Sequence, residues 1–217
     1  MLDTAIQRTN MVAAQLRTND VTDARVRDAM ATIPRERFVP EASRPVAYME
    51  CCIALGGGRV LLDPRCFAKL LQLAAVKPED VVLDVGCGTG YSAAVLSLLA
   101  GRVFALEEDP ELVARAADNL REFGAGDAQA IRGPLTKGSP EHAPFDVIVL
   151  NGAVEVEPTA LLAQLKDGGR LVAVGRDGAA GHARLYLNHR GAIGERNAFE
   201  AQVPVLPGFE KPRSFVF

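Results

Sequence analysis

Histidine and cysteine are scarce in this sequence, and tryptophan is absent. The chain has three histidines, and its four cysteines, Cys51, Cys52, Cys66 and Cys87, form no C-x-x-C pair. Protein metal centres are built mainly from these two residue types at close spacing, so the sequence gives a metal site little support. Cys51 and Cys52 are adjacent, which strains a disulfide between them, and we expect reduced, mostly buried thiols.

Long apolar runs and an excess of one charge are also missing. No apolar run approaches the roughly 20 residues that a membrane-spanning helix needs, and the first residues do not resemble a signal peptide. The net charge is -3, without the basic bias that nucleic-acid phosphates favour. We therefore expect a cytoplasmic protein with no membrane or nucleic-acid partner. Its 217 residues suit one α/β domain with a small helical cap.

Residues 81–91 combine a strand, a glycine turn and the start of a helix. The apolar run 81–85 has the composition of a strand buried on both faces in a parallel sheet. Gly86, Gly88 and Gly90 follow it, and then comes a helical pattern that Gly101 closes. The glycines remove every Cβ at this corner, so a bulky ligand can lie against bare backbone near a helix N-terminus. The pattern predicts a seat for a nucleotide-type cofactor.

The glycine spacing distinguishes between cofactors. A dinucleotide fingerprint, G-x-G-x-x-G, would need a third glycine where Tyr91 stands, so NAD is disfavoured. The segment instead resembles motif I of class I S-adenosylmethionine (SAM) dependent methyltransferases, with Asp84 as the acid before a G-x-G-x-G turn. Glu107 ends the next predicted strand, where α/β cofactor folds place a carboxylate for ribose hydroxyls. The alternative is a solvated charge beside Glu108 and Asp109; the glycine turn favours ribose binding.

A second resemblance lies in the N-terminal part of the chain. Its residues, in order, are Met11-Val12, Gln15-Leu16, Thr22-Asp23, Arg25-Val26, Ala29-Met30, Pro34-Arg35, Phe38-Val39-Pro40 and Ala47-Tyr48. This order resembles the protein-L-isoaspartate O-methyltransferases, from about Met11 to the C-terminus. That family uses SAM to methylate a carboxyl group of isoaspartyl residues in damaged proteins. The resemblance implies a protein or peptide substrate; it leaves the oligomeric state open, with a monomer slightly favoured.

The resemblance also implies a fold. We expect an α/β, Rossmann-like class I methyltransferase with a mostly parallel central sheet, helices on both faces and C-terminal antiparallel strands. Residues 1–76 would form a helical cap and substrate loop, and residues 77–217 the cofactor core, in one domain. Thr22 is the expected N-cap of the second cap helix, and Pro158 is expected to start a helix carrying Leu161, Leu162 and Leu165. The tail, 183–188 and 199–205, reads as a hairpin that completes the sheet edge and is functionally quiet.

Two segments depart from the family pattern. The family loop G-x-G-Q-T-I-S-x-P reads here from Gly56 to Pro64, with Arg59, Val60 and Leu62 in place of glutamine, threonine and serine. In the family that serine is thought to contact the methyl-accepting carboxylate, and a leucine cannot hydrogen-bond. The charge of an acceptor would then have to be met by backbone N–H groups or by Arg59. Likewise, Pro134 stands where the family has an aspartate near the adenine, whose amino group must find another acceptor.

The resemblance assigns candidate residues to two sites, with no catalytic residue identified. The SAM site would comprise Asp84, Gly86, Cys87, Gly88, Gly90, Tyr91, Glu107 and Asn151, and the substrate loop would comprise Gly58, Arg59, Val60 and Leu62. Asn151 follows a predicted strand, 143–150, and is either a polar group for cofactor or substrate or a turn residue.

Three functions remain open at this point. The chain is a carboxyl methyltransferase of the isoaspartyl repair family with altered acceptor choice, a SAM-binding member that has lost catalysis, or a small-molecule methyltransferase on the same scaffold. Methyl transfer from a sulfonium to a carboxylate mainly requires alignment and exclusion of water. Loss of the serine should therefore slow or redirect the activity rather than abolish it.

Overall fold

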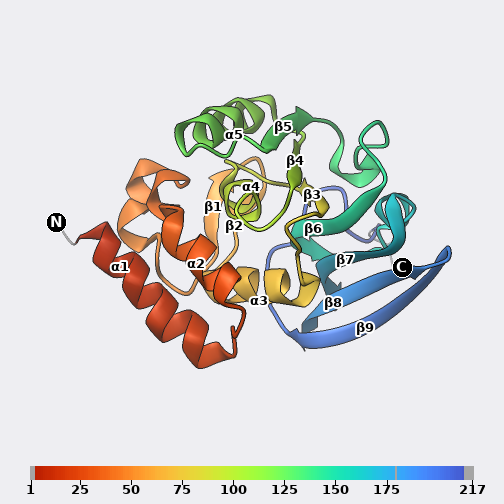
Figure 1. The fold of residues 1–217 in the computed structure, drawn as a ribbon, viewed down its shortest axis with the longest axis horizontal. Coiled ribbons are helices and arrows are strands. Elements are labelled where there is room, and N and C mark those ends of the chain that lie inside the picture. Colours follow the sequence, from red (N-terminus) through yellow and green to blue (C-terminus); the bar gives the residue numbers. More distant parts are fainter. Residues whose placement is uncertain (1–2, 179, 213–217) are drawn as a thin grey trace, which may run out of the picture.

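A seven-stranded sheet forms the centre of the computed structural model, which describes residues 3–178 and 180–212 (Figure 1). Its strands, in spatial order, are β5 (Ala128–Arg132), β4 (Arg102–Glu107), β3 (Val81–Val85), β6 (Phe145–Val154), β7 (Leu165–Asp177), β8 (Ala180–His189) and β9 (Ala192–Glu200). The first five run parallel to one another. Strand β8 is antiparallel to β7, and β9 is antiparallel to β8. The predicted fold class is confirmed.

The central strands are apolar because both of their faces are covered. Leu83 on β3 lies opposite Phe104 on β4 and Ile148 on β6, and all three are buried. Such near-continuous apolar runs are typical of parallel strands between two layers. The carboxyl ends of β3, β4 and β6 therefore meet at one edge of the sheet.

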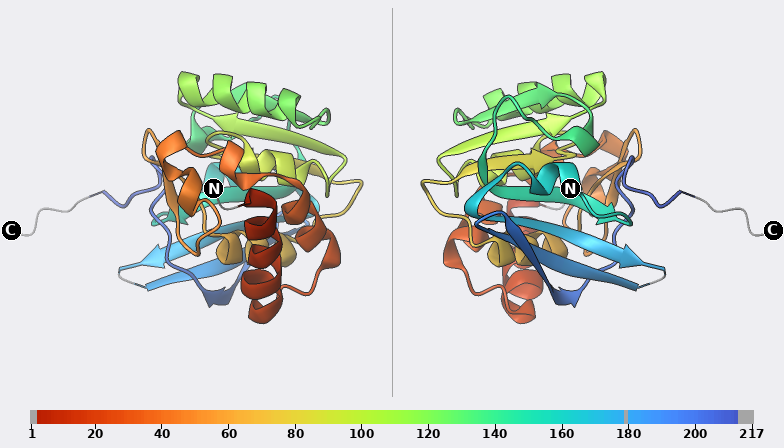
Figure 2. Two further views of the ribbon diagram at one scale, coloured as in Figure 1. Left: turned by 90° about the vertical axis from the view of Figure 1, so that its left-hand side faces the viewer. Right: turned by 90° about the vertical axis from the view of Figure 1, so that its right-hand side faces the viewer.

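The helices cover the two faces of the sheet unequally. They are α1 (Thr4–Met11), α2 (Ala24–Thr32), α3 (Pro64–Ala74), α4 (Tyr91–Leu96), α5 (Pro110–Glu122) and α6 (Thr159–Leu162). One buried cluster joins α2, α3, α4 and α5 to one face. The other cluster consists of the second face, the short α6 and the C-terminal side chains Leu206 and Phe209. Figure 2 shows the sheet between these layers.

Two helices begin at an Asp-Pro pair. Asp63 Oδ1 accepts from the Cys66 amide at 2.8 Å, with Pro64 in the first turn of α3. Asp109 caps α5 in the same way, because a carboxylate satisfies the first free N–H groups and proline needs no partner there.

Three local predictions are wrong. The N-cap of α2 is Asp23, whose carboxylate accepts from the Arg25 amide at 2.9 Å, because Thr22 is bonded elsewhere. Leu165 belongs to β7, since α6 already ends at Leu162. The helix after the glycine turn, α4, ends at Leu96, well before Gly101.

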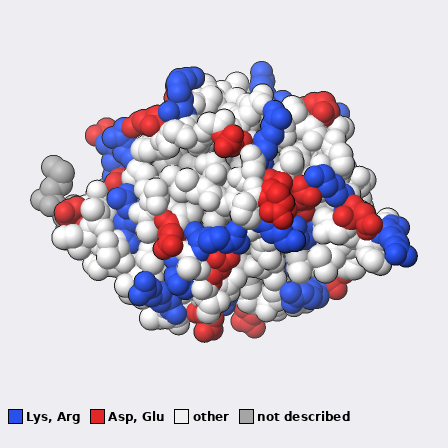
Figure 3. Space-filling view, viewed as in Figure 1, with Lys and Arg blue, Asp and Glu red and all other residues white. Residues whose placement is uncertain are grey.

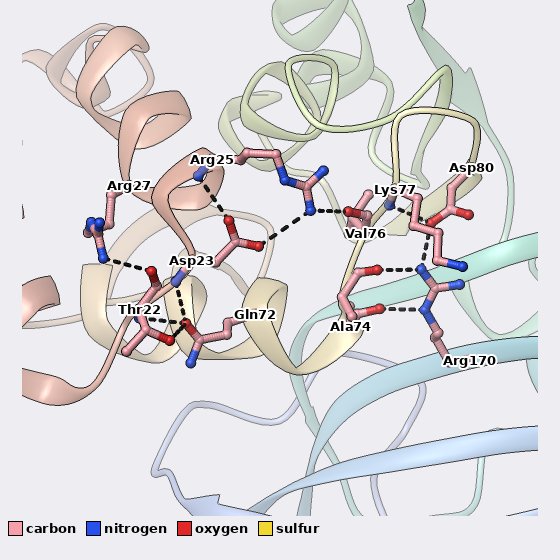
Figure 4. A network of polar contacts seen from close by, with 11 residues as sticks. Thr22, Asp23, Arg25, Arg27, Gln72, Ala74, Val76, Lys77, Asp80 and Arg170 are labelled. Carbon is pink, nitrogen blue, oxygen red and sulfur yellow. Dashed lines mark hydrogen bonds and ion pairs between the residues drawn. The ribbon is translucent and has the colours of Figure 1, made fainter.

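Gln72 and Arg170 tie the N-terminal helices and α3 to the sheet (Figure 4). Gln72 Oε1 accepts from the amides of Thr22 (2.7 Å) and Asp23 (2.9 Å). Arg170, on β7, donates to the Ala74 carbonyl at the C-terminal end of α3 and to Asp80 Oδ2, the latter at 2.6 Å. The N-terminal helices are thus fixed to α3, and α3 to the sheet, by polar contacts as well as by packing.

The face shown in Figure 3 carries groups of both charges side by side, between uncharged areas. Within residues 3–178 and 180–212, no helix is long and apolar enough to cross a membrane.

Candidate functional site

Asp84 is the buried acid at the end of β3. Its carboxylate accepts from Ser92 Oγ at 2.6 Å and from Asn151 Nδ2 at 2.7 Å. Burial raises the pKa of Asp84 from 3.8 to about 6; the two hydrogen bonds oppose this rise, and the charge of Glu107 adds to it. Asn151 lies inside β6 and is not a turn residue, so the turn alternative is wrong.

The glycine turn after β3 needs its glycines. Gly86, Gly88 and Gly90 have φ values of 71°, 56° and 91°, which side chains rarely adopt. The amides of Gly86 and Cys87 both donate to the carbonyl of Leu106, at 2.9 and 3.2 Å. These bonds hold the turn against the end of β4.

The glycine corner is covered by apolar side chains, contrary to the expectation of bare backbone. A Cβ at Gly86 would lie 2.8 Å from Leu206 Cδ1, and one at Gly88 would lie 2.6 Å from Leu55 Cδ1. The cavity left beside Gly86 has a volume of about 10 Å³. This is no more than the space of one water molecule.

The C-terminal segment supplies part of this cover, beyond the sheet edge to which the sequence assigned the tail. The Leu206 amide donates to the Ala153 carbonyl, and the Ala153 amide to the Pro204 carbonyl, both at 2.8 Å. Pro207 Cγ lies 2.8 Å from the position of a Cβ on Gly58. Residues 204–207 thus run across the end of β6 and onto the substrate loop.

Glu107 is fully buried at the end of β4 and is not a solvated charge. It forms an ion pair with Arg59, whose Nη2 lies 3.0 Å from Glu107 Oε1. Arg59 Nε lies 3.1 Å from both carboxylate oxygens, and the Gly88 amide donates to Oε2 at 3.1 Å. The predicted ribose carboxylate and the predicted loop cation therefore bind each other.

The substrate loop is a hairpin of β1 (Ile53–Gly56) and β2 (Arg59–Leu61). Val60 and Leu62 line the small cavity together with Asn151, so this cavity joins the loop to the glycine corner. Leu62 is 3% exposed. The family serine position is thus buried and apolar in this chain.

Arg35 is a cation at the same cavity that sequence reasoning did not assign to the site. It is fully buried, and its Nε and Nη2 donate to the carbonyls of Ala47 (2.7 Å) and Leu62. Within residues 3–178 and 180–212, neither its Nη1 nor the neighbouring hydroxyl of Tyr91 has a hydrogen-bond partner, and the Tyr91 ring lies 5.2 Å from the guanidinium carbon. The Pro34-Arg35 pair in the family resemblance was the available signal.

Tyr91 and Pro134 lie on different sides of the expected cofactor site. The Tyr91 ring packs against Phe38 and Phe67, with centroids 5.5 and 5.7 Å apart, and so faces the cap. Pro134 precedes a short 3-10 turn, in which Leu135 is buried near Gly86.

A groove of about 580 Å³ opens beside the loop on its other side. It is lined by Glu50, Cys51, Cys52, Asp63, Arg65, Cys66, Ala180, Gly181, His182, Glu200, Ala201 and Gln202. Asp63 directly follows Leu62, so the open groove and the small buried cavity adjoin. The four cysteines are free thiols, and Cys51 is exposed at the groove wall.

Comparison with known proteins gives consistent matches. The family model "Protein-L-isoaspartate(D-aspartate) O-methyltransferase (PCMT)" matches residues 7–194. A protein-L-isoaspartate O-methyltransferase of Methylorubrum extorquens is 40% identical over 95% of this chain and 91% of its own length. One of Synechococcus sp. is 39% identical over 93% and 86%.

A solved structure has the same fold. The putative protein-L-isoaspartate O-methyltransferase of Plasmodium falciparum, in complex with S-adenosyl-L-homocysteine, has a TM-score of 0.80 at 18% identity, covering 92% of this chain and 97% of that one. Another protein-L-isoaspartate O-methyltransferase structure has a TM-score of 0.79 at 24% identity, and this chain covers 66% of its length.

Proposed function

The chain belongs to the protein-L-isoaspartate O-methyltransferase family, with SAM as cofactor and methylation of isoaspartyl residues as activity, and we propose that it carries out this reaction where β3, β4 and β6 end. The observation that carries the proposal is the convergence of Asp84, Glu107 and Asn151 on one glycine turn. In this proposal residues 1–76 form the cap and substrate loop, and residues 77–217 the cofactor core, of one domain.

The polar groups of the corner suit an adenosyl cofactor. The cofactor would be held by Asp84, Gly86, Cys87, Gly88, Gly90, Glu107 and Asn151, with Tyr91 supporting the turn from the cap side. Glycine backbone allows close approach, and a carboxylate can accept from both hydroxyls of a ribose. The available space does not suit it, because Leu55, Leu206 and Arg59 occupy the corner. These side chains must move before a ligand of that size can enter.

Arg35 is proposed to meet the charge of the acceptor carboxylate. The sequence suggested backbone amides or Arg59, but Arg59 is engaged with Glu107. Arg35 lines the cavity beside Leu62, is fully buried and has an unpartnered Nη1. A charge-assisted bond from this nitrogen would replace the missing serine hydroxyl.

In this proposal the residues of the chain align the acceptor carboxylate and exclude water, and none of them transfers a proton. When bound, SAM supplies a methyl group on a positively charged sulfur. An isoaspartyl carboxylate is already an anion, so no side chain has to remove a proton from it. Val60, Leu62 and Leu206 exclude water from the cavity, and Arg35 orients the acceptor.

The groove beside the loop is proposed to take the protein or peptide substrate. It adjoins Leu62 through Asp63, so an extended segment lying in it can turn one side chain toward the small cavity. Its mixed lining, with Glu50, Arg65 and His182, suits a polar backbone of varied sequence.

The test is transfer of a labelled methyl group from SAM to a synthetic isoaspartyl peptide, beside the same peptide with a normal aspartate. We expect base-labile label on the isoaspartyl peptide alone. The second candidate is a SAM-binding protein without catalysis, which the apolar Leu62 favours. It would bind SAM in calorimetry and label neither peptide, whereas label on both peptides would mark a different acceptor choice.

A further inference from the structure

Glu107 has no spare hydrogen-bonding capacity. Its Oε1 accepts from the amides of Glu108 (2.7 Å) and Asp109 (3.1 Å) and from Arg59, and its Oε2 accepts from Gly88 and Arg59. A carboxylate offers about four lone-pair positions. Backbone amides take three of them, and the guanidinium takes the rest, so a ribose diol could bind Glu107 only in place of Arg59.

Two of the obstructing groups come from one hairpin. Arg59 lies on β2 and Leu55 on β1, and Leu55 Cδ1 covers Gly88 while Arg59 Nη1 donates to the Gly57 carbonyl at 3.1 Å. In the described part of the chain, β1 and β2 pair with each other and with no strand of the seven-stranded sheet. A shift of this small hairpin would free both the glycine and the carboxylate.

We propose that Arg59 is a latch on the cofactor site: its guanidinium occupies the ribose-binding position on Glu107, and adenosyl ligands bind only after displacing it. The inference rests on the proposed function, because it takes Glu107 as the ribose carboxylate. It concerns this chain in particular, since the loop pattern that the chain resembles has a glutamine at this position. Displacement exchanges a buried ion pair for bonds to neutral hydroxyls, which lowers the affinity for SAM.

The experiment compares SAM and S-adenosylhomocysteine binding by calorimetry in the wild type, Arg59→Gln and Arg121→Gln. Arg121 pairs with Asp118 at 2.9 Å on the surface, so its variant loses the same charge far from the site. Arg59→Gln should bind both ligands at least tenfold more tightly than the wild type, and Arg121→Gln should match the wild type. Arg59→Lys, which keeps the charge but loses the planar fork, should fall between them and serves if Arg59→Gln does not fold.

Binding of adenosine and of 2′,3′-dideoxyadenosine then tests whether the ribose hydroxyls and Arg59 compete for Glu107. The gain in Arg59→Gln should appear for adenosine and be absent for the dideoxy analogue. An equal gain for both would overturn the competition at Glu107, and unchanged or weaker SAM binding in Arg59→Gln would overturn the latch while leaving the methyltransferase assignment intact. If none of the proteins bound SAM, both proposals would fail.

Discussion

The amide of Asn151 on β6 donates to the carboxylate of Asp84 on β3 over 2.7 Å, joining two neighbouring parallel strands at their carboxyl ends. Ser92, in the first turn of α4, donates to the other oxygen. Asp84 is fully buried, and among the described residues its carboxylate bonds to two neutral donors and to no cation, so these donors alone offset the cost of its charge. This explains a pKa raised to about 6.

Asp84→Asn should therefore stabilise the protein at neutral pH. The folded state takes up a proton at Asp84 near pH 6 and the unfolded state near pH 3.8, so the penalty of the buried charge is full above pH 6 and disappears below about pH 4. The rise in pKa corresponds to at most roughly 3 kcal/mol, reduced by weaker bonds to the amide. Urea denaturation between pH 4 and 8 should show a gain that grows with pH.

Asp146→Asn is the matched control, with the opposite sign. Burial alone would raise the pKa of Asp146, but hydrogen bonds from Lys166 and the Val81 amide bring it below its usual range. That carboxylate stabilises the fold above its unfolded pKa, so its loss should destabilise at pH 7 and matter less in acid. A gain from Asp84→Asn that did not vary with pH would contradict the buried-charge explanation.

Gln72→Ala should loosen the N-terminal helices from α3. Gln72 accepts from two amides at the start of α2 and donates to the Asp20 carbonyl at 2.9 Å. Loss of these bonds should lower the free energy of unfolding by about 1–2 kcal/mol, measured in urea. Gln129→Ala, at an exposed position of β5, is the control; an equal loss in both variants would show that the bonds of Gln72 add nothing.

The sheet could be predicted because each strand is marked by a pattern within its own short stretch of sequence. The runs at β3 and β4 are mostly apolar and end at turn residues, and parallel strands bring their carboxyl ends to one edge. From this alone Asp84 and Glu107 could be expected near one glycine turn. The starts of α3 and α5 could be predicted in the same way, since Asp63 and Asp109 each stand directly before a proline that starts the helix.

The contents of the glycine corner were not predictable in this way. Leu206 lies more than a hundred residues from Gly86 in sequence, and no local pattern says which distant side chain covers a glycine. Arg59 could equally have faced an acceptor or Glu107, and only the register of the β1–β2 hairpin decides between them. The prediction of Thr22 as the cap was wrong for the same reason: its hydroxyl and its amide both donate to the distant Gln72 on α3, and the carboxylate of Asp23 caps the helix.

Leu62→Ser should raise the rate of methyl transfer to an isoaspartyl peptide. The new hydroxyl would lie at the buried cavity beside Arg35 and could donate to the acceptor carboxylate, which a leucine cannot. One added hydrogen bond to a charged group is worth about 1.5–3 kcal/mol, so kcat/KM should rise by roughly tenfold or more. Leu62→Ala is the control for lost volume. If alanine accelerated the reaction as much as serine, space rather than the hydroxyl would be limiting.

Alkylation of Cys51 should interfere with the protein substrate and not with SAM. Cys51 is exposed on the wall of the 580 Å³ groove, whereas Cys66 and Cys87 are buried and should react slowly. A maleimide adduct there would obstruct an extended peptide, so KM for an isoaspartyl peptide should rise severalfold while the calorimetric affinity for SAM stays constant. Cys51→Ser treated in the same way controls for reaction at the half-buried Cys52. Because Asp63 lines the groove and Leu62 lines the small cavity, a peptide in the groove would lie beside that cavity. A peptide bound elsewhere would leave the KM of the alkylated wild type unchanged, and the groove assignment would then be wrong.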